Sequence, residues 1–127
     1  MLKYAYKPNP KKSAKAYGRN LDLSVKDAQL VCKAINRLQL QKGIALLEGL
    51  AGERRDINGK HYTKTAREIL DLLKSAQSNA EFKGLEEEKL HIYASSHKGF
   101  ETSTGRRHQV AAQKRIYTHV QLVLVER

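Results

Sequence analysis

The segment from residue 98 to residue 115 contains the side chains of this sequence that are best suited to binding a charged group. The planar guanidinium of arginine can donate to two phosphate oxygens at once and can stack on an exposed base. Gly99 and Gly105 would let the backbone approach a ligand closely. This combination suits folded RNA, which has bent backbones and unstacked loop bases. The candidate contacts are Lys98, Arg106, Arg107, His108, Lys114 and Arg115.

A second basic block lies near the N-terminus. Residues 1–20 contain six lysines and arginines and no acid, residues 21–89 are nearly balanced, and residues 90–127 contain six cations and two acids. The net charge of +11 is therefore concentrated at the two ends of the chain, which predicts a polyanionic partner, because basic side chains displace the counterions of phosphates. The candidate contacts in this block are Lys11, Lys12, Lys15 and Arg19.

The five histidines do not have a spacing typical of a metal site, and the single cysteine cannot complete a zinc set. His97 is a candidate RNA contact. With His108 it also allows an alternative function, that of a ribonuclease in which two histidines and a lysine act as acid, base and charge stabiliser. General acid–base catalysis needs a walled pocket, which a thin arm does not supply. We therefore expect no enzyme: no catalytic residue, no metal site and no cofactor.

Two other residue types allow simpler interpretations. Cys32, in the apolar stretch AQLVCKAIN, is predicted to be a buried core residue. Tyr4, Tyr6 and Tyr17 lie among the N-terminal cations, where they would either stack on bases or anchor the strand to the core. Both interpretations of the tyrosines stay open at the level of sequence.

Helical periodicity dominates the centre of the chain. A helix is predicted from about residue 24 to 38, with Ser24 as its N-cap, and a shorter one before Gly52. The longest helix begins near residue 63 and ends before Gly84. Its apolar stripe consists of Ala66, Ile69, Leu70, Leu73, Ala76 and Ala80.

After this helix, the segments KLHIYASS and RIYTHVQLVLVE contain apolar residues at every second position. This period of two predicts two strands. They most simply pair antiparallel, so that residues 97–115 form a protruding hairpin arm. The segment around residues 14–19 predicts a third strand after a basic tail. The expected fold is α+β: about three helices packed on a small three-stranded antiparallel sheet, with a long basic β-hairpin and a basic N-terminal extension.

The length of 127 residues suits one domain, with a tail at 1–12, a core at 13–96 and 116–127, and the arm at 97–115. No apolar run is long enough for a signal peptide or a membrane span, so we expect a soluble intracellular protein.

Four segments, in this order, resemble the large-subunit ribosomal protein L-twenty-two family in its archaeal and eukaryotic form. They are SAKAYGRNLDLSVKDA at 13–28, NAEFKGL at 79–85, LHIYASSHKG at 90–99 and THVQLVLVE at 118–126. The resemblance implies a non-enzymatic cytoplasmic protein of the large ribosomal subunit that binds ribosomal RNA and contacts neighbouring ribosomal proteins. It also implies that the arm helps to line the nascent-peptide exit tunnel, where its tip would meet the nascent peptide, and that no homo-oligomer forms.

An architectural DNA-binding protein that grips duplex DNA with basic β-arms is the alternative among binding proteins. Such arms commonly carry an apolar wedge or a proline at the tip, which unstacks a base step. The segment RRHQVAAQK offers only Val110 and two alanines for that purpose. The sequence therefore favours RNA over duplex DNA.

Overall fold

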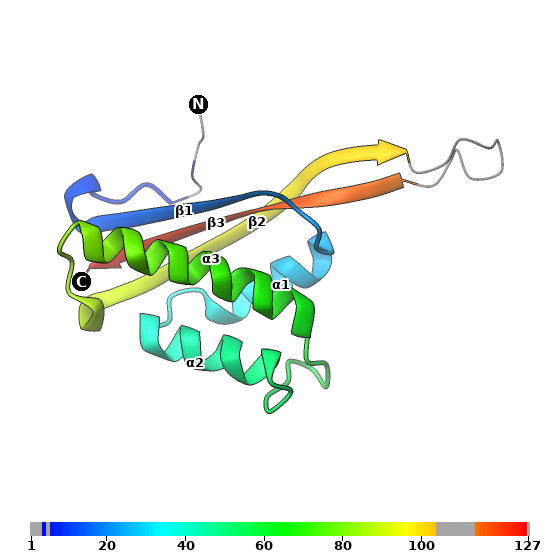
Figure 1. Ribbon diagram of the computed structural model, residues 1–127, viewed down its shortest axis with the longest axis horizontal. Helices are drawn as coiled ribbons and strands as arrows, with labels where there is room; N and C mark the ends of the chain where they lie inside the picture. Colours follow the sequence, from blue (N-terminus) through cyan, green and yellow to red (C-terminus); the bar gives the residue numbers. More distant parts are fainter. Residues whose placement is uncertain (1–3, 5, 104–113, 127) are drawn as a thin grey trace.

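The computed structural model describes Tyr4 and residues 6–103 and 114–126, with the backbone alone at residues 102, 103, 114 and 115. Three helices lie on one face of a three-stranded sheet (Figure 1). The predicted α+β class is thereby confirmed. The strands are β1 (Ser13–Leu21), β2 (Leu90–Ser103) and β3 (Lys114–Glu126), and the helices are α1 (Val25–Ile35), α2 (Leu40–Ala51) and α3 (Thr63–Phe82). Single 3₁₀ turns, η1 (Pro10–Lys12) and η2 (Glu87–Lys89), precede β1 and β2.

Helix α1 begins as predicted but ends three residues before residue 38. The Ser24 hydroxyl accepts a hydrogen bond from the Asp27 amide at 3.4 Å, which caps the first turn. At the other end, the Arg37 amide donates to the Ile92 carbonyl at 2.6 Å, and Arg37 has a positive φ of 68°. The helix ends early because residues 36–39 instead run along the free edge of β2, where an unpaired strand would expose its backbone polar groups.

The other two helices agree with their sequence patterns. Helix α2 ends at Ala51, directly before Gly52, and α3 is followed by Gly84, whose φ of +74° is a conformation that glycine adopts without strain. The apolar stripe predicted for α3 is entirely buried. Its members pack with residues of α1, α2 and the sheet in one core cluster.

The sheet has the order β1-β3-β2, and both pairs are antiparallel. The predicted pairing of the last two strands is confirmed, with a ladder that runs from Leu90 opposite Glu126 to Ser103 opposite Lys114. The predicted third strand is β1, which pairs with the other edge of β3. Strands β2 and β3 continue together beyond the helices, which places the root of the arm at one end of the sheet (Figure 1).

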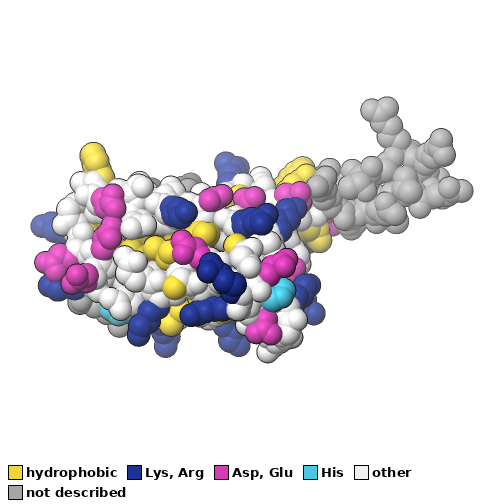
Figure 2. All heavy atoms as spheres, turned by 60° about the horizontal axis from the view of Figure 1, so that its bottom comes forward, with side chains coloured by type: hydrophobic (Ala, Val, Ile, Leu, Met, Phe, Trp, Pro, Cys, Tyr) yellow, Lys and Arg dark blue, Asp and Glu magenta, His cyan; other side chains and the backbone are white. Residues whose placement is uncertain are grey.

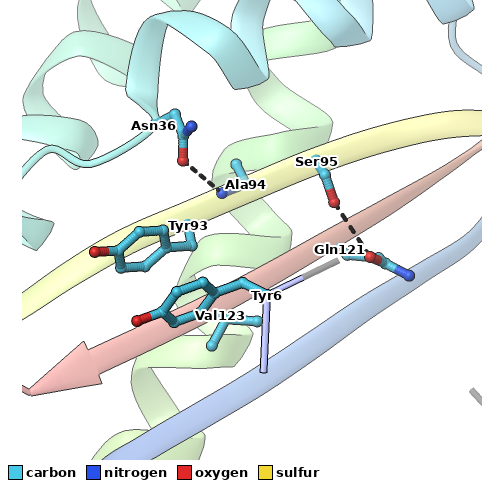
Figure 3. Close-up of a pocket in the computed structure, with 7 residues that line it drawn as sticks. All are labelled: Tyr6, Asn36, Tyr93, Ala94, Ser95, Gln121 and Val123. Carbon is cyan, nitrogen blue, oxygen red and sulfur yellow. Dashed lines mark hydrogen bonds between the residues drawn. The ribbon is translucent and has the colours of Figure 1, made fainter. Parts of the chain in front are cut away.

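Strand β3 is buried on both of its faces near its C-terminal end. Val120, Leu122 and Leu124 face the helices and are fully buried. Val123 and Val125, on the opposite face, are also buried, which simple alternation does not predict. Tyr6 of the N-terminal segment lies beside Val123 on that face (Figure 3). The N-terminal segment therefore covers part of the face that the helices leave open.

Replacing Leu73 by alanine is expected to destabilise the fold by about 2–5 kcal/mol, because it leaves a cavity at a fully buried position of α3. The measurement is the free energy of unfolding from chemical denaturation. Lys74→Ala, at the exposed neighbouring position, is the control and should change that free energy by less than about 0.5 kcal/mol. Equal effects of the two variants would contradict the position of the core.

Candidate nucleic-acid interface

The sheet face away from the helices gathers basic and aromatic side chains from all three strands. On β1, Lys15, Tyr17 and Arg19 alternate with the buried residues of the core face. The register places Tyr17 opposite Gln121 of β3, and His97 of β2 opposite His119 of β3. We call this surface, made of Lys15, Tyr17, Arg19, His97 and His119, the open face.

Aromatic rings on the open face are in contact with one another. The centre of the His119 ring lies 5.0 Å from that of His97 and 5.6 Å from that of Tyr17. Tyr4 packs edge-on against Tyr17 at 6.1 Å, and the Lys15 ammonium lies 5.0 Å from the centre of the Tyr4 ring. These rings and cations form a surface on which a nucleic-acid base can stack and a phosphate can bind.

The structure favours the anchoring interpretation of Tyr6. Its ring stacks on Tyr93 of β2, with a centre-to-centre distance of 4.0 Å and an interplanar angle of 3° (Figure 3). A pocket of about 250 Å³ lies between this pair and Gln121, whose side-chain oxygen accepts a hydrogen bond from the Ser95 hydroxyl at 3.1 Å. The tyrosine pair holds the N-terminal segment, and the basic residues that follow it, against the sheet.

The root of the arm is held by Asn20, at the end of β1. Asn20 has a left-handed φ of 52°, and its amide donates to Nδ1 of His119 at 3.1 Å. Its side-chain oxygen accepts from the Phe100 amide at 3.0 Å. A Cβ atom at Gly99 would lie 2.8 Å from that oxygen and 3.0 Å from the Tyr117 carbonyl oxygen. Gly99 therefore makes room for Asn20, whereas the sequence predicted that it makes room for a ligand.

These contacts coincide with two irregularities in the sheet. The register shifts between Gly18 and Leu21 on β1, and between Lys98 and Glu101 on β2. Bulges of this kind bend and twist a strand. Asn20 lies within the first of these shifts and bonds to both of the other strands, to His119 of β3 and Phe100 of β2, so it fixes the direction in which the arm leaves the sheet.

His119 is held in its neutral form. Burial, and then the nearby His97 and Arg19, lower the pKa of His119 below its ordinary value. The hydrogen bond from Asn20 acts in the same direction, because a protonated Nδ1 cannot accept it. The neutral ring therefore keeps Nε2 as the hydrogen-bond donor.

The structure brings together only some of the predicted contact residues. Lys15, Arg19 and His97 lie on the open face, and Lys11 and Lys12 are exposed in the adjoining turn η1. Lys98 forms an ion pair with Glu101 at 2.6 Å. Lys114 and Arg115 belong to β3, where their backbone alone is described, and Arg106, Arg107 and His108 lie outside the described residues.

Residue types alone did not indicate that His119 and Asn20 belong to this surface. His119 lies in a predicted strand, and the sequence suggests His108, which lies outside the described residues, as the partner of His97. The sequence did contain a signal for the contact between His97 and His119. In an antiparallel pair of the last two strands, these residues lie at similar distances from the hairpin tip and therefore opposite each other. Asn20 gave no such signal, since its role depends on contacts with residues about 80 and 99 positions away.

The opposite side of the molecule has a different charge pattern. Figure 2 shows that lysines, arginines, aspartates and glutamates are interspersed on the side where the helices lie. Surface pairs such as Lys64–Asp22 and Lys89–Glu86, at 3.4 Å and 2.9 Å, are typical of such a mixed surface. The helical side is therefore less suited to a polyanion than the open face.

Other kinds of site find little support in the described part of the chain. It contains no cluster of three or more histidine, cysteine, aspartate or glutamate side chains that would hold a metal ion. Cys32 is buried as predicted, and burial raises the pKa of its thiol to about 12, so the thiolate nucleophile does not form near neutral pH. Among the described helices, none is both long and apolar enough to cross a bilayer.

Replacing Asn20 by glycine is expected to loosen the arm root. Glycine tolerates the left-handed φ but removes the oxygen that accepts from the Phe100 amide. Amide hydrogen exchange at Phe100 should become roughly 2- to 10-fold faster, the factor that corresponds to one hydrogen bond of about 0.5–1.5 kcal/mol. Asn20→Asp keeps an acceptor oxygen and should exchange at nearly the original rate. Equally fast exchange in both variants would show that the Asn20 side chain does not hold the root.

The lowered pKa of His119 predicts that stability decreases with acidification. The neutral ring contributes stability that is fully present above about pH 6.5, the pKa in an unfolded chain, and is lost as the pH falls below that value. His119→Asn places an acceptor near the position of Nδ1 but does not titrate. The midpoint of thermal unfolding, measured at about pH 7.5 and about pH 5, should fall more for the parent protein than for this variant. Parallel falls would exclude His119 as the titrating group.

Comparison with known proteins agrees with the resemblance read from the sequence. The profile of the family described as ribosomal protein L22p/L17e matches residues 16–123. The chain is 37% identical to the large ribosomal subunit protein uL22 of Methanocaldococcus jannaschii, over 77% of this chain and 76% of that protein. It is 32% identical to the uL22 protein of Methanococcus aeolicus, over 98% and 97% of the two chains.

The relatives are not confined to archaea. The uL22 protein of Zea mays is 33% identical, and the alignment covers all of this chain and 90% of the plant protein. The matched region contains most of β1, the three helices, β2 and most of β3, so the arm root and all of the open face except Lys15 lie within it. The chain belongs to the ribosomal protein L22p/L17e family.

Proposed function

We propose that this protein is a structural constituent of the large ribosomal subunit in the cytoplasm and that it binds large-subunit ribosomal RNA. The observation that carries the proposal is the family match across residues 16–123, together with relatives that are named as proteins of that subunit. The protein acts as a binding element and not as an enzyme. Its neighbours in the subunit are RNA and other ribosomal proteins, and it forms no homo-oligomer.

The distribution of charge supports RNA as the main partner. The net charge is +11, and Lys15 and Arg19 lie on the open face while Lys11 and Lys12 are exposed in the turn before β1. Phosphate contacts by these cations release counterions and position the protein. Specificity comes from the shape of the folded RNA, because no base-reading motif is present in the sequence.

In this proposal each part of the chain has its own role. The core, residues 13–96 and 116–127, presents the open face together with His97 at the start of the arm, and the tail at 1–12 adds Lys11 and Lys12. The arm at 97–115 reaches into RNA and helps to line the nascent-peptide exit tunnel, where its tip meets the nascent chain. The ion pair between Lys98 and Glu101 is a surface pair, so a phosphate can replace Glu101 at little cost.

Removing four cations of the arm should separate binding from folding. Arg106, Arg107, Lys114 and Arg115 are replaced together by alanine, and affinity for protein-free large-subunit ribosomal RNA is measured across a series of salt concentrations. Each lost phosphate contact lowers the slope of log affinity against log salt by about 0.7–0.9, so the slope should fall by about 3. The thermal midpoint should stay unchanged, because we expect the arm to contribute little to the core.

The control removes the same charge from the helical side. Lys26, Lys33, Lys42 and Lys74 are all exposed on helices, and their joint replacement by alanine should lower the salt slope much less. Equal losses in the two quadruple variants would mean that net charge, and not the arm, determines binding. A preference for duplex DNA over ribosomal RNA, at the same salt concentration, would contradict the proposed function.

Co-sedimentation tests the cellular part of the proposal. On a sucrose gradient of cell extract, the protein should migrate with large ribosomal subunits and remain with them after washing at moderate salt. RNA that is incubated with the purified protein should stay intact. Cleavage that disappears in His97→Ala or His108→Ala would support a ribonuclease instead.

A further inference from the structure

The ring of Phe82, the last residue of α3, is 94% exposed to solvent. Among the described residues, the other large exposed apolar side chains are Phe100 and Ile116, at 58% and 40%, and both lie in the arm strands. A single exposed apolar side chain is common and is not by itself a site. The surroundings of Phe82 decide whether its exposure has a function.

Phe82 lines a groove of about 300 Å³ between the end of α3 and the start of β1. Hydrogen bonds fix the positions of the elements around it. The side-chain Nδ2 of Asn79 donates to the Lys15 carbonyl oxygen at 2.9 Å. The Lys83 ammonium donates to the carbonyl oxygens of Ser13 and Pro10, at 2.9 Å and 3.3 Å. These contacts join α3 to β1 and η1, so the groove is already formed in the free protein.

The charges around the groove favour an anionic occupant. Both charged residues that line it, Lys15 and Lys83, are basic, and η1 adds the exposed Lys11 and Lys12 beside Pro10. The Lys83 ammonium makes two of its three possible hydrogen bonds to the groove carbonyls, which leaves one proton for a further acceptor. Glu81 precedes Phe82 in the sequence but does not line the groove. Its carboxyl group is instead hydrogen-bonded to Glu87 of η2.

The size and charge of the groove fit a nucleotide. Phe82 and Pro10 supply apolar surface on which a base can pack, and both charged residues of the lining are basic. The exposed apolar residues of the arm do not extend this patch, because the C-terminal end of α3 lies at the end of the sheet away from the arm (Figure 1). An isolated ring among cations is the arrangement that stacks on a base and binds its phosphate.

We propose that this groove binds one unpaired nucleotide of ribosomal RNA, with its base stacked on Phe82 and its phosphate at Lys83. The proposal rests on the proposed function, because it assumes that RNA is the partner. It adds a contact at the end of the molecule opposite the arm. Two contacts that far apart would fix the orientation of the protein on the RNA, which a single flexible attachment would not.

The test compares three variants of the full chain in binding to protein-free large-subunit ribosomal RNA. Phe82→Ala should weaken binding about 5- to 150-fold, the loss expected for one base–aromatic stack. Phe82→Tyr keeps the ring and should bind like the parent protein. Phe82→Leu keeps the apolar character but not the aromatic face, and should be weakened nearly as much as Phe82→Ala. Because the ring is exposed, all three variants should keep the parent thermal midpoint.

Two further readouts identify the contact as stacking. The salt slope of Phe82→Ala should equal that of the parent protein, since the substitution removes no charge. Ultraviolet cross-linking of the parent complex, followed by mass spectrometry, should find a nucleotide attached to the peptide that contains Phe82.

The outcomes separate this inference from the proposed function. If the parent protein and Phe82→Ala bind RNA equally well, the nucleotide site is wrong while the RNA-binding function stands. If Phe82→Leu binds like the parent protein, the ring makes an apolar contact and the stacking site is wrong. If Phe82→Ala binds free RNA normally but fails to enter large subunits, the groove contacts another protein and the inference is overturned. If the parent protein does not bind the RNA at all, both proposals fail.

Discussion

The pairing of β3 with a strand on each side is the interaction on which the rest of the structure depends. Every residue from Thr118 to Val125 except His119 is buried, so this short segment supplies apolar contacts to both faces of the sheet. Its two neighbours come from opposite ends of the chain: β1 carries the N-terminal cations, and β2 forms the arm with β3. Both strands therefore lie in one sheet because they pair with the same central strand.

The helices cover one face of this sheet, and that one-sided arrangement separates the surfaces of the protein. The covered face contributes small or branched apolar residues such as Ala14, Ala16 and Leu122 to the core. On the other face, the N-terminal segment and its stacked tyrosines protect the apolar part, while the part near the arm keeps exposed cations and rings. The open face is therefore already formed in the protein, so a ligand that binds there would not have to order it.

The arm root shows how a few polar contacts set the geometry of a long hairpin. A two-stranded ribbon has little core of its own and twists easily, so its direction depends on where it leaves the sheet. Asn20, His119 and Gly99 fix that point through backbone hydrogen bonds and one close approach. At the other end of the sheet, Lys83 and Asn79 hold α3 to the first strand in a similar way.

The sequence by itself determined the elements, the pairing of β2 with β3, the buried stripe of α3 and the charge asymmetry, because periodicity and composition are local properties. It also determined the family, since four matched segments occur in order. Only the tertiary structure decided that α1 ends at Ile35, that His97 meets His119, that Tyr6 anchors the tail, and that Phe82 stays exposed beside a basic groove. These features depend on contacts between residues far apart in the chain, and the geometry of such contacts is set by the packing of the whole fold.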